Sequence, residues 1–282
     1  MFGLKDTTEL LPTHIHQFKG RLWAKKRIRK DSAGQQKQIS AGFVYSTMIR
    51  LKAYIKRLSE RNYLEWLRAS DIPLNKIILQ EPVYLTKAEM WAVIDCLDKW
   101  IVEVEATKYK RDWKYPAYMG RALVRMLYTT WLRNAEIRNL KLRDIDFERM
   151  TGVILWKGNK HGFFTFNEKA KEVLMIYLQK RREYYPNRRF TYLFSSANKD
   201  KGKCITGTGV NTLLMLIGKK AGVDKKLHAH VFRHTCATHL LDSGANIREV
   251  QEKLRHANLD TTALYTHVSN NKLTEITKGL WS

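Results

Sequence analysis

Long apolar runs, paired cysteines and acidic residues are all scarce in this chain of 282 residues. No apolar run approaches the ~20 residues that a helix needs to span a membrane. The three cysteines, Cys96, Cys204 and Cys236, are odd in number and far apart, so they predict no disulfide framework. The N-terminus lacks the basic region and apolar core of a secretory signal. These absences predict a cytoplasmic protein in a reducing compartment, with no membrane partner.

The shortage of acidic residues leaves a large positive charge. The chain has 51 Lys and Arg against 27 Asp and Glu, which gives a formal net charge of +24. This charge exceeds what solubility requires, and a polyanionic partner is the simplest explanation for it. The 44% content of hydrophobic residues and the eight tryptophans are typical of a folded protein. The composition therefore indicates a folded protein that binds nucleic acid or another anionic surface.

A basic run precedes the first clear helix. Residues 19–30, KGRLWAKKRIRK, carry seven basic side chains and no acidic one, and a polar, loop-like stretch follows them. The alternatives are an arm that faces DNA and a solvated helix face or tail. The DNA-binding interpretation assigns phosphate contacts to Lys25, Lys26, Arg27, Arg29 and Lys30.

The next part of the chain predicts helices and then a domain boundary. Met48, Leu51, Ile55 and Leu58 follow helical spacing, with Arg50 among the basic residues around them as a further DNA contact. A second helix is predicted through residues 63–69, YLEWLRA. Two prolines in residues 72–84 then interrupt the helical pattern. We therefore expect a helical domain at 1–78, a second domain at 79–268 and a C-terminal tail at 269–282.

The second domain has the pattern of a mainly α protein with a small antiparallel sheet. Thr86 and Glu89 have the spacing of a capping box, and apolar helices are predicted at about 87–105 and 117–131. The segments GVILW and FFTF flank KGNKHG and predict a β-hairpin. Helices are predicted to resume from Glu168 and from Asn211.

Four short stretches contain residue types that could perform chemistry. They are TTWLRNAEI, LWKGNKHG, HAHVFRHTCATH and LRHANLDTTALYTHV. The third suggests zinc first, through His228, His230, His234, Cys236 and His239. However, no second ligand pair follows at a zinc-finger distance, so the metal site is the weaker alternative. Each stretch alone is a weak signal, and their order and spacing carry the information.

Together these stretches resemble the tyrosine recombinase (phage integrase) family, and most closely its compact Xer-like members. The family's TGLRxxEL is matched at 130–137, its GKGNK at 156–160 and its HxLRH at 230–234, followed by a helix through 236–254. Its closing LGH and TTxxYTHV are matched at 254–256 and 261–268. The resemblance covers residues 85–268. It implies a C-shaped DNA clamp that combines a helical core-binding domain with an α+β catalytic domain.

The resemblance also implies the chemistry. Family members attack a DNA phosphodiester with a tyrosine, form a 3′-phosphotyrosyl bond, and pass through a Holliday junction without a metal or other cofactor. The nucleophile here would be Tyr265, with Lys157 as general acid and His230 as proton acceptor. Two arginines and a further histidine would stabilise the transition state. The implied catalytic set is Arg133, Lys157, His230, Arg233, His256 and Tyr265.

The implied partners are double-stranded DNA with an inverted-repeat core site and three further copies of the chain, as a homotetramer on two DNA sites. Lys160 would help the hairpin to bind DNA. The tail carries Leu273, Ile276, Leu280 and Trp281 roughly on one helix face. It would dock either on a neighbouring protomer or on its own domain. The biological use, whether integration and excision, cointegrate resolution or dimer resolution, stays open, as do accessory proteins.

The sequence departs from the family pattern at three places. Trp131 replaces a common glycine, Gly162 and residues 163–165 replace a basic residue and VPL, and Arg255 replaces another glycine. None of these changes removes a catalytic side chain. The alternatives to a recombinase are therefore a site-specific DNA-binding protein with weak or no catalysis and an enzyme similar to type IB topoisomerases.

Overall fold

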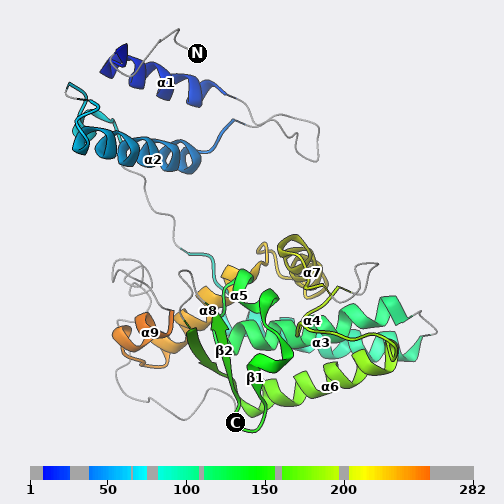
Figure 1. Ribbon diagram of the computed structural model, residues 1–282. Coiled ribbons are helices and arrows are strands. Elements are labelled where there is room, and N and C mark those ends of the chain that lie inside the picture. Colours follow the sequence, from blue (N-terminus) through cyan, green and yellow to red (C-terminus); the bar gives the residue numbers. More distant parts are fainter. Residues whose placement is uncertain are drawn as a thin grey trace. The chain divides into compact units, whose positions relative to one another are not determined.

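A computed structural model of the chain describes residues 9–25, 38–64, 66–74, 82–107, 111–155, 161–196 and 203–254. The chain divides into two compact units, Met1–Gln80 and Glu81–Ser282 (Figure 1). Among the described residues, the search for a helix with the length and hydropathy of a membrane span found none. The side chains of residues 111–113 and 251–253 lie outside the description.

The first unit is built on two helices, α1 (Pro12–Ala24) and α2 (Ala41–Glu60). The predicted amphipathic helix is confirmed as α2, which buries Met48 and Ile55. It begins at Ala41 because the Ser40 hydroxyl accepts a hydrogen bond from the Phe43 N–H at 3.3 Å. The buried face of α2 forms a small core with Ile15 of α1.

The helix predicted through residues 63–69 is wrong for the described part of that segment. Asn62 takes a left-handed φ of +58° at the end of α2, and residues 64, 67 and 68 have no regular structure. Among the described residues of this segment, helical structure is limited to the start of the short 3-10 helix η2 (Ala69–Asp71). The buried side chains of Leu64 and Leu67 already complete the core under α2, so the segment needs no further helical turn to bury its apolar residues.

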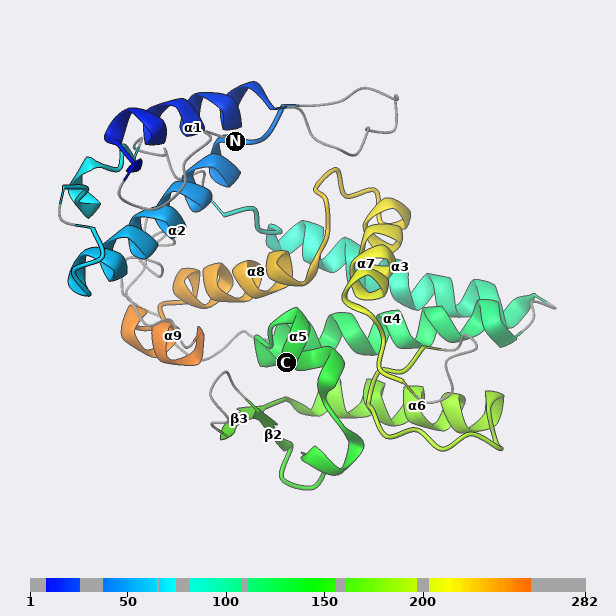
Figure 2. The same ribbon diagram turned by 45° about the horizontal axis from the view of Figure 1, so that its top comes forward.

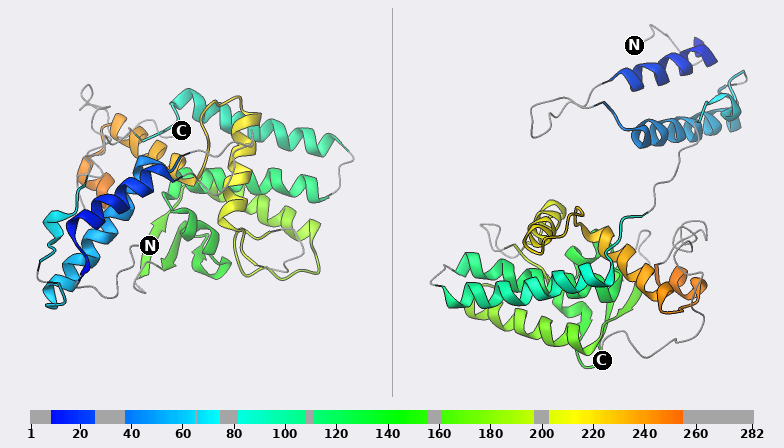
Figure 3. Two further views of the ribbon diagram at one scale, coloured as in Figure 1. Left: turned by 90° about the horizontal axis from the view of Figure 1, so that it is seen from above. Right: turned by 180° about the vertical axis from the view of Figure 1, so that it is seen from behind.

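The second unit is mainly helical and is centred on one long helix, α4. Its helices are α3 (Lys87–Ala106), α4 (Arg111–Thr130), α5 (Asn134–Asn139), α6 (Glu168–Tyr184), α7 (Gly207–Lys220), α8 (Ala229–Asp242) and α9 (Ile247–Leu254). Helix α4 lies between α3 and α6, and its contacts extend to α7 and α8 (Figures 2 and 3). The helices predicted at about 87–105 and 117–131, from Glu168 and from Asn211 are confirmed, although α4 and α7 begin earlier than expected.

The start of α3 shows why the local prediction succeeded. The Thr86 hydroxyl accepts the Glu89 N–H at 3.2 Å, and the Glu89 carboxylate accepts the Thr86 N–H at 2.7 Å. This reciprocal pair is the predicted capping box, which is therefore confirmed. The earlier start of α7 has the same kind of cause, because the Thr206 hydroxyl accepts the Gly209 N–H at 2.9 Å.

The helix expected through residues 236–254 is interrupted. Helix α8 ends at Asp242, Gly244 takes a φ of +92°, and α9 begins at Ile247. The Ala245 N–H donates to the Leu240 carbonyl at 3.0 Å, which terminates α8 with a left-handed glycine. The prediction of one continuous helix is therefore wrong at residues 243–246.

A three-stranded antiparallel sheet flanks the helices, in the order β1 (Ile145–Asp146), β2 (Thr151–Leu155) and β3 (His161–Thr165). Val153 pairs with Phe163 and Leu155 with His161, so the predicted hairpin is confirmed. The turn residues 156–160 lie outside the described residues. Phe163 points outward and is 76% exposed, whereas Phe164 packs in the core.

We expect Gly152→Ala to destabilise the second unit. A Cβ at residue 152 would lie 2.5 Å from Phe164 Cε1 and closer still to Cζ, with the Asp144 carbonyl at 3.1 Å. Such overpacking should lower the unfolding temperature by roughly 3 to 10 °C in calorimetry. Gly207→Ala is the matched control, because the nearest atom to its Cβ is Asn134 Oδ1 at 3.7 Å. Equal unfolding temperatures for the two variants would contradict this packing.

Candidate active site

Arg133 lies at the start of α5, where it is the N-cap residue. The carboxylate of Glu136 accepts two hydrogen bonds from Arg133. Its Oε2 accepts the backbone N–H of Arg133 at 2.8 Å, and its Oε1 accepts a bond from Nη1 of the guanidinium at 3.1 Å. The arginine side chain is still 41% exposed. Its backbone and its charged group are thus fixed by one partner, while the guanidinium stays accessible to a ligand.

Glu136 is a residue of the site that the sequence reasoning missed. The signal was present, because Arg133 and Glu136 have the spacing of N-cap and N3 positions, where a glutamate reaches back to the cap N–H. The spacing predicts the backbone bond. The second bond, to the guanidinium, depends on the side-chain conformation and has no sequence signal of its own.

His230 and Arg233 come from the first two turns of α8, three residues apart and therefore on one side of the helix. The guanidinium of Arg233 is buried, with 4% of the residue exposed. Its Nη1 donates to the Trp131 carbonyl at 2.5 Å, and its Nη2 donates to the Leu254 carbonyl. Arg233 thus ties α8 both to the connection before Arg133 and to the end of α9.

The pKa of His230 responds to the charges of the two predicted arginines. The pKa of His230 is lowered, first by partial burial of its ring and then by the positive charges of its neighbours His228, Arg233 and Arg133. Both arginines therefore act on one imidazole, although they come from different helices. The lowered pKa keeps the imidazole neutral at neutral pH, so that it can accept a proton.

The other members of the histidine cluster have different surroundings. Cys236 and His239 are buried, and Nδ1 of His239 lies 2.8 Å from the Tyr128 hydroxyl, with which it shares a hydrogen bond. Burial raises the pKa of the Cys236 thiol, which makes it a poor metal ligand. In the described part of the chain, no three His, Cys, Asp or Glu side chains are arranged to hold a metal ion.

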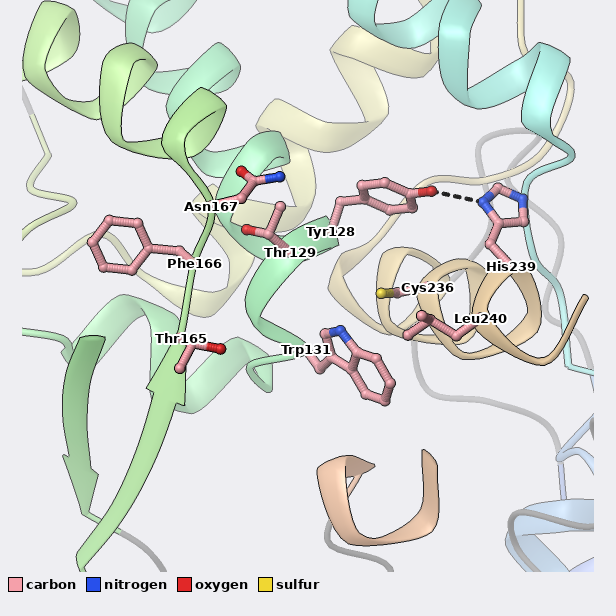
Figure 4. A pocket seen from close by; sticks show the side chains of 9 residues that line it. All are labelled: Tyr128, Thr129, Trp131, Thr165, Phe166, Asn167, Cys236, His239 and Leu240. Carbon is pink, nitrogen blue, oxygen red and sulfur yellow. Dashed lines mark hydrogen bonds between the residues drawn. The ribbon is translucent and has the colours of Figure 1, made fainter. Parts of the chain in front are cut away.

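A cavity of about 260 Å³ lies beside this segment, between α4, α8 and the end of β3 (Figure 4). It is lined by Tyr128, Thr129, Trp131, Thr165, Phe166, Asn167, Cys236, His239 and Leu240. The indole of Trp131 forms one of its walls, and the Tyr128 to His239 hydrogen bond lies at another (Figure 4). Its lining has no Lys, Arg, Asp or Glu, so it offers no charged group to a phosphate.

Half of the predicted catalytic set can be placed. Arg133, His230 and Arg233 come together, whereas Lys157, His256 and Tyr265 lie outside the described residues. The same holds for Lys26, Arg27, Arg29, Lys30 and Lys160 of the predicted DNA contacts. Lys25 is exposed and directly follows α1.

Arg50 belongs to an exposed stripe on α2. With Arg57 and Arg61 it shares the solvent face of the helix, and the aromatic side chains of Phe43 and Tyr54 lie on the same face. Arginine can bind phosphate, and exposed aromatic rings can contact bases or sugars. We name these five residues the α2 stripe. Of these residues only Arg50 was predicted to contact DNA, although the helical spacing of Arg57 and Arg61 indicates the same face.

Comparison with known proteins gives a consistent result. Residues 104–272 match the model of the Phage integrase family. Tyrosine recombinase XerC of Staphylococcus carnosus (strain TM300) is 32% identical over 247 residues, which are 83% of this chain and 77% of the relative. The crystal structure of XerA recombinase shares 25% identity at a TM-score of 0.54, with 94% and 82% of the two chains covered.

A second solved structure is that of the XerH site-specific recombinase bound to difH substrate, in a pre-cleavage complex. It shares 25% identity with this chain at a TM-score of 0.58. The match covers 79% of this chain and 60% of the XerH chain.

Removal of the Arg133 charge should raise the pKa of His230. The pKa of His230 lies below its ordinary value of 6.5. With respect to this group the fold is therefore most stable above pH 6.5, where the imidazole is neutral. This stability is lost as the pH falls through the folded-state pKa. Arg133→Gln should move the pKa upward in an NMR titration of labelled histidines. Arg143→Gln, which removes a side chain that is 77% exposed, should leave it unchanged. A His230 pKa that does not respond to Arg133→Gln would contradict the proximity of the two residues.

Proposed function

The chain belongs to the phage integrase family, and on this premise we propose how its residues carry out the reaction. The protein is a site-specific DNA recombinase of the tyrosine type, an enzyme that cleaves and rejoins DNA strands. Its fold is mainly α with a small antiparallel sheet. The residue roles, the DNA site and the assembly that follow are our proposal.

The proposed reaction begins at Tyr265. Its phenol oxygen attacks the DNA phosphorus, the bond from phosphorus to the 5′-oxygen breaks, and a 3′-phosphotyrosyl ester remains. The tyrosine proton passes to His230, and Lys157 protonates the leaving 5′-oxygen. A 5′-hydroxyl from another strand then attacks the ester and releases the tyrosine. The ester conserves the energy of the original phosphodiester, so the exchange needs no ATP.

The placement of Arg133 and Arg233 around His230 is the observation that carries this proposal. Two guanidinium groups beside one neutral imidazole supply what the reaction requires, namely fixed donors for the phosphate charge and a group that accepts a proton. The lowered pKa of His230 favours the second role. In our proposal His256 donates a further hydrogen bond to the phosphate.

We further propose that four copies of the chain assemble on two DNA sites and exchange strands through a Holliday junction. Each site would be double-stranded DNA with an inverted-repeat core, because two-fold related subunits bind symmetric half-sites. XerH, one of the structural neighbours, was solved bound to difH substrate. In this assembly the first unit is the core-binding domain, the second unit is the catalytic domain, and the tail at 269–282 docks either in cis or on a neighbouring subunit.

The α2 stripe supports the binding role of the first unit. Its three arginines are exposed and share one face with two exposed aromatic residues. Each phosphate contact releases counterions from DNA, so the affinity should depend steeply on salt concentration. We assign the stripe to the DNA interface, together with the predicted contacts Lys25, Lys26, Arg27, Arg29, Lys30 and Lys160.

We expect the wild-type protein to form an SDS-resistant adduct with its target DNA in EDTA, because the chemistry uses side chains only. Tyr265→Phe should bind the same DNA in a mobility-shift assay and form no adduct. Tyr63→Phe, which changes an exposed tyrosine outside the proposed site, is the matched control and should react as the wild type does. An adduct in Tyr265→Phe would exclude this nucleophile. Binding without an adduct in the wild type would instead indicate a DNA-binding protein without catalysis.

The α2 stripe predicts a specific salt dependence. Arg50→Ala should weaken binding and reduce the slope of log K against log salt by about 1, as expected for the loss of one phosphate contact. Lys56→Ala is the matched control, since Lys56 is exposed on another face of α2 and lies 3.7 Å from Glu60. Fluorescence anisotropy over a salt series measures both slopes. Equal slopes for the two variants would exclude Arg50 from the interface.

A further inference from the structure

Trp131 has a backbone conformation that its side chain disfavours. Its φ is +60°, in the left-handed region that glycine adopts freely. Among the described residues, the other non-glycine positions with positive φ are Asn62 and Met150. Asparagine is a common residue in this region, but a bulky aromatic residue is not. Such a residue persists only where the surrounding structure holds it, and these positions gather at functional sites.

The position of Trp131 in the chain connects it to both arginines. It directly follows the end of α4, and Arg133 comes two residues later as the N-cap of α5. Its carbonyl accepts the hydrogen bond from Nη1 of Arg233 at 2.5 Å. A change of φ at residue 131 would therefore redirect the chain before Arg133 and also withdraw the carbonyl from Arg233.

The burial of the indole stabilises the left-handed backbone conformation of Trp131. Only 7% of Trp131 is exposed. Its ring lines the cavity together with Cys236 and Leu240 of α8 and lies on the side toward them (Figure 4). A backbone rotation to the ordinary right-handed region would swing the indole out of this place. The burial of so large an apolar group thus offsets the cost of the left-handed backbone.

We propose that Trp131 is a positioning residue for catalysis. Its buried indole locks a left-handed backbone, and that backbone presents the carbonyl to Arg233 while it sets the direction of the chain at Arg133. Packing of the indole at this position stabilises a positive φ that a glycine would adopt without steric cost. This inference rests on the proposed function, because it assigns the two arginines to the phosphate. Trp131 itself touches neither the substrate nor the reacting atoms.

The test compares Trp131→Gly with Trp131→Ala, which both remove the indole but differ in their tolerance of positive φ. Single-turnover cleavage at saturating DNA, DNA affinity and unfolding temperature are measured for each variant. We expect both variants to melt below the wild type and to bind DNA with nearly its affinity. Trp131→Gly should cleave within about threefold of the wild type, and Trp131→Ala about five- to thirtyfold more slowly than Trp131→Gly.

Met150 provides the matched control, since it also has a positive φ, of +52°, but lies between β1 and β2. Met150→Gly and Met150→Ala should differ in unfolding temperature and cleave at equal rates. If Trp131 had only a structural role, its variants would behave like those of Met150. Folded Trp131→Gly and folded Trp131→Ala would then cleave DNA at equal rates. That result would overturn the proposal.

The wild-type result separates this inference from the proposed function. Without an adduct in the wild type, the proposed function itself fails. If the wild type forms the adduct and Trp131→Gly cleaves more than about thirtyfold slower while it still binds DNA, the backbone conformation is not what positions the arginines, and only the positioning role is overturned. This second criterion uses Trp131→Gly alone, so it holds even if Trp131→Ala does not fold.

Discussion

The buried guanidinium of Arg233 is the interaction on which the arrangement of the site depends. It joins α8 to the carbonyl of Trp131 and to that of Leu254, so one side chain links three segments of the second unit. A buried charge is costly unless hydrogen bonds replace its water. Removal of the guanidinium would leave two inward-facing carbonyls without this donor, each at a cost of about 1–3 kcal/mol. The same group therefore stabilises the fold and is positioned by it.

The positive charge around His230 disfavours protonation of its ring and favours the binding of an anion. Arg133, Arg233 and the neighbouring His228 all disfavour a proton on its ring. Glu136 compensates part of this charge, because its carboxylate pairs with the Arg133 guanidinium. A phosphate that enters between the arginines would supply the missing negative charge. In the proposed reaction, groups that repel one another would thus stabilise the negative charge of the transition state.

The sequence predicted the features that local chemistry determines. The capping box of Thr86 and Glu89, the hairpin of β2 and β3, and the common helix face of His230 and Arg233 all follow from spacing within a few residues. It did not predict the break at Gly244 or the irregular segment after Asn62. Each of these depends on a left-handed residue that ends a helix, and on how the following chain packs. The bond from Arg233 to Trp131 joins residues 102 positions apart, and no local pattern could indicate it.

The exchange of glycine for tryptophan at residue 131 shows how packing can replace backbone freedom. A glycine, which the family pattern has at this position, can adopt positive φ without a steric cost. Here a bulky residue adopts it, and the indole that disfavours the conformation also holds it, because its burial against α8 would be lost on rotation. The ring does not fill the space between α4, α8 and β3 completely, because a cavity of about 260 Å³ remains beside it. The departure from the family pattern therefore changes how the first arginine is positioned, while its guanidinium remains in the site.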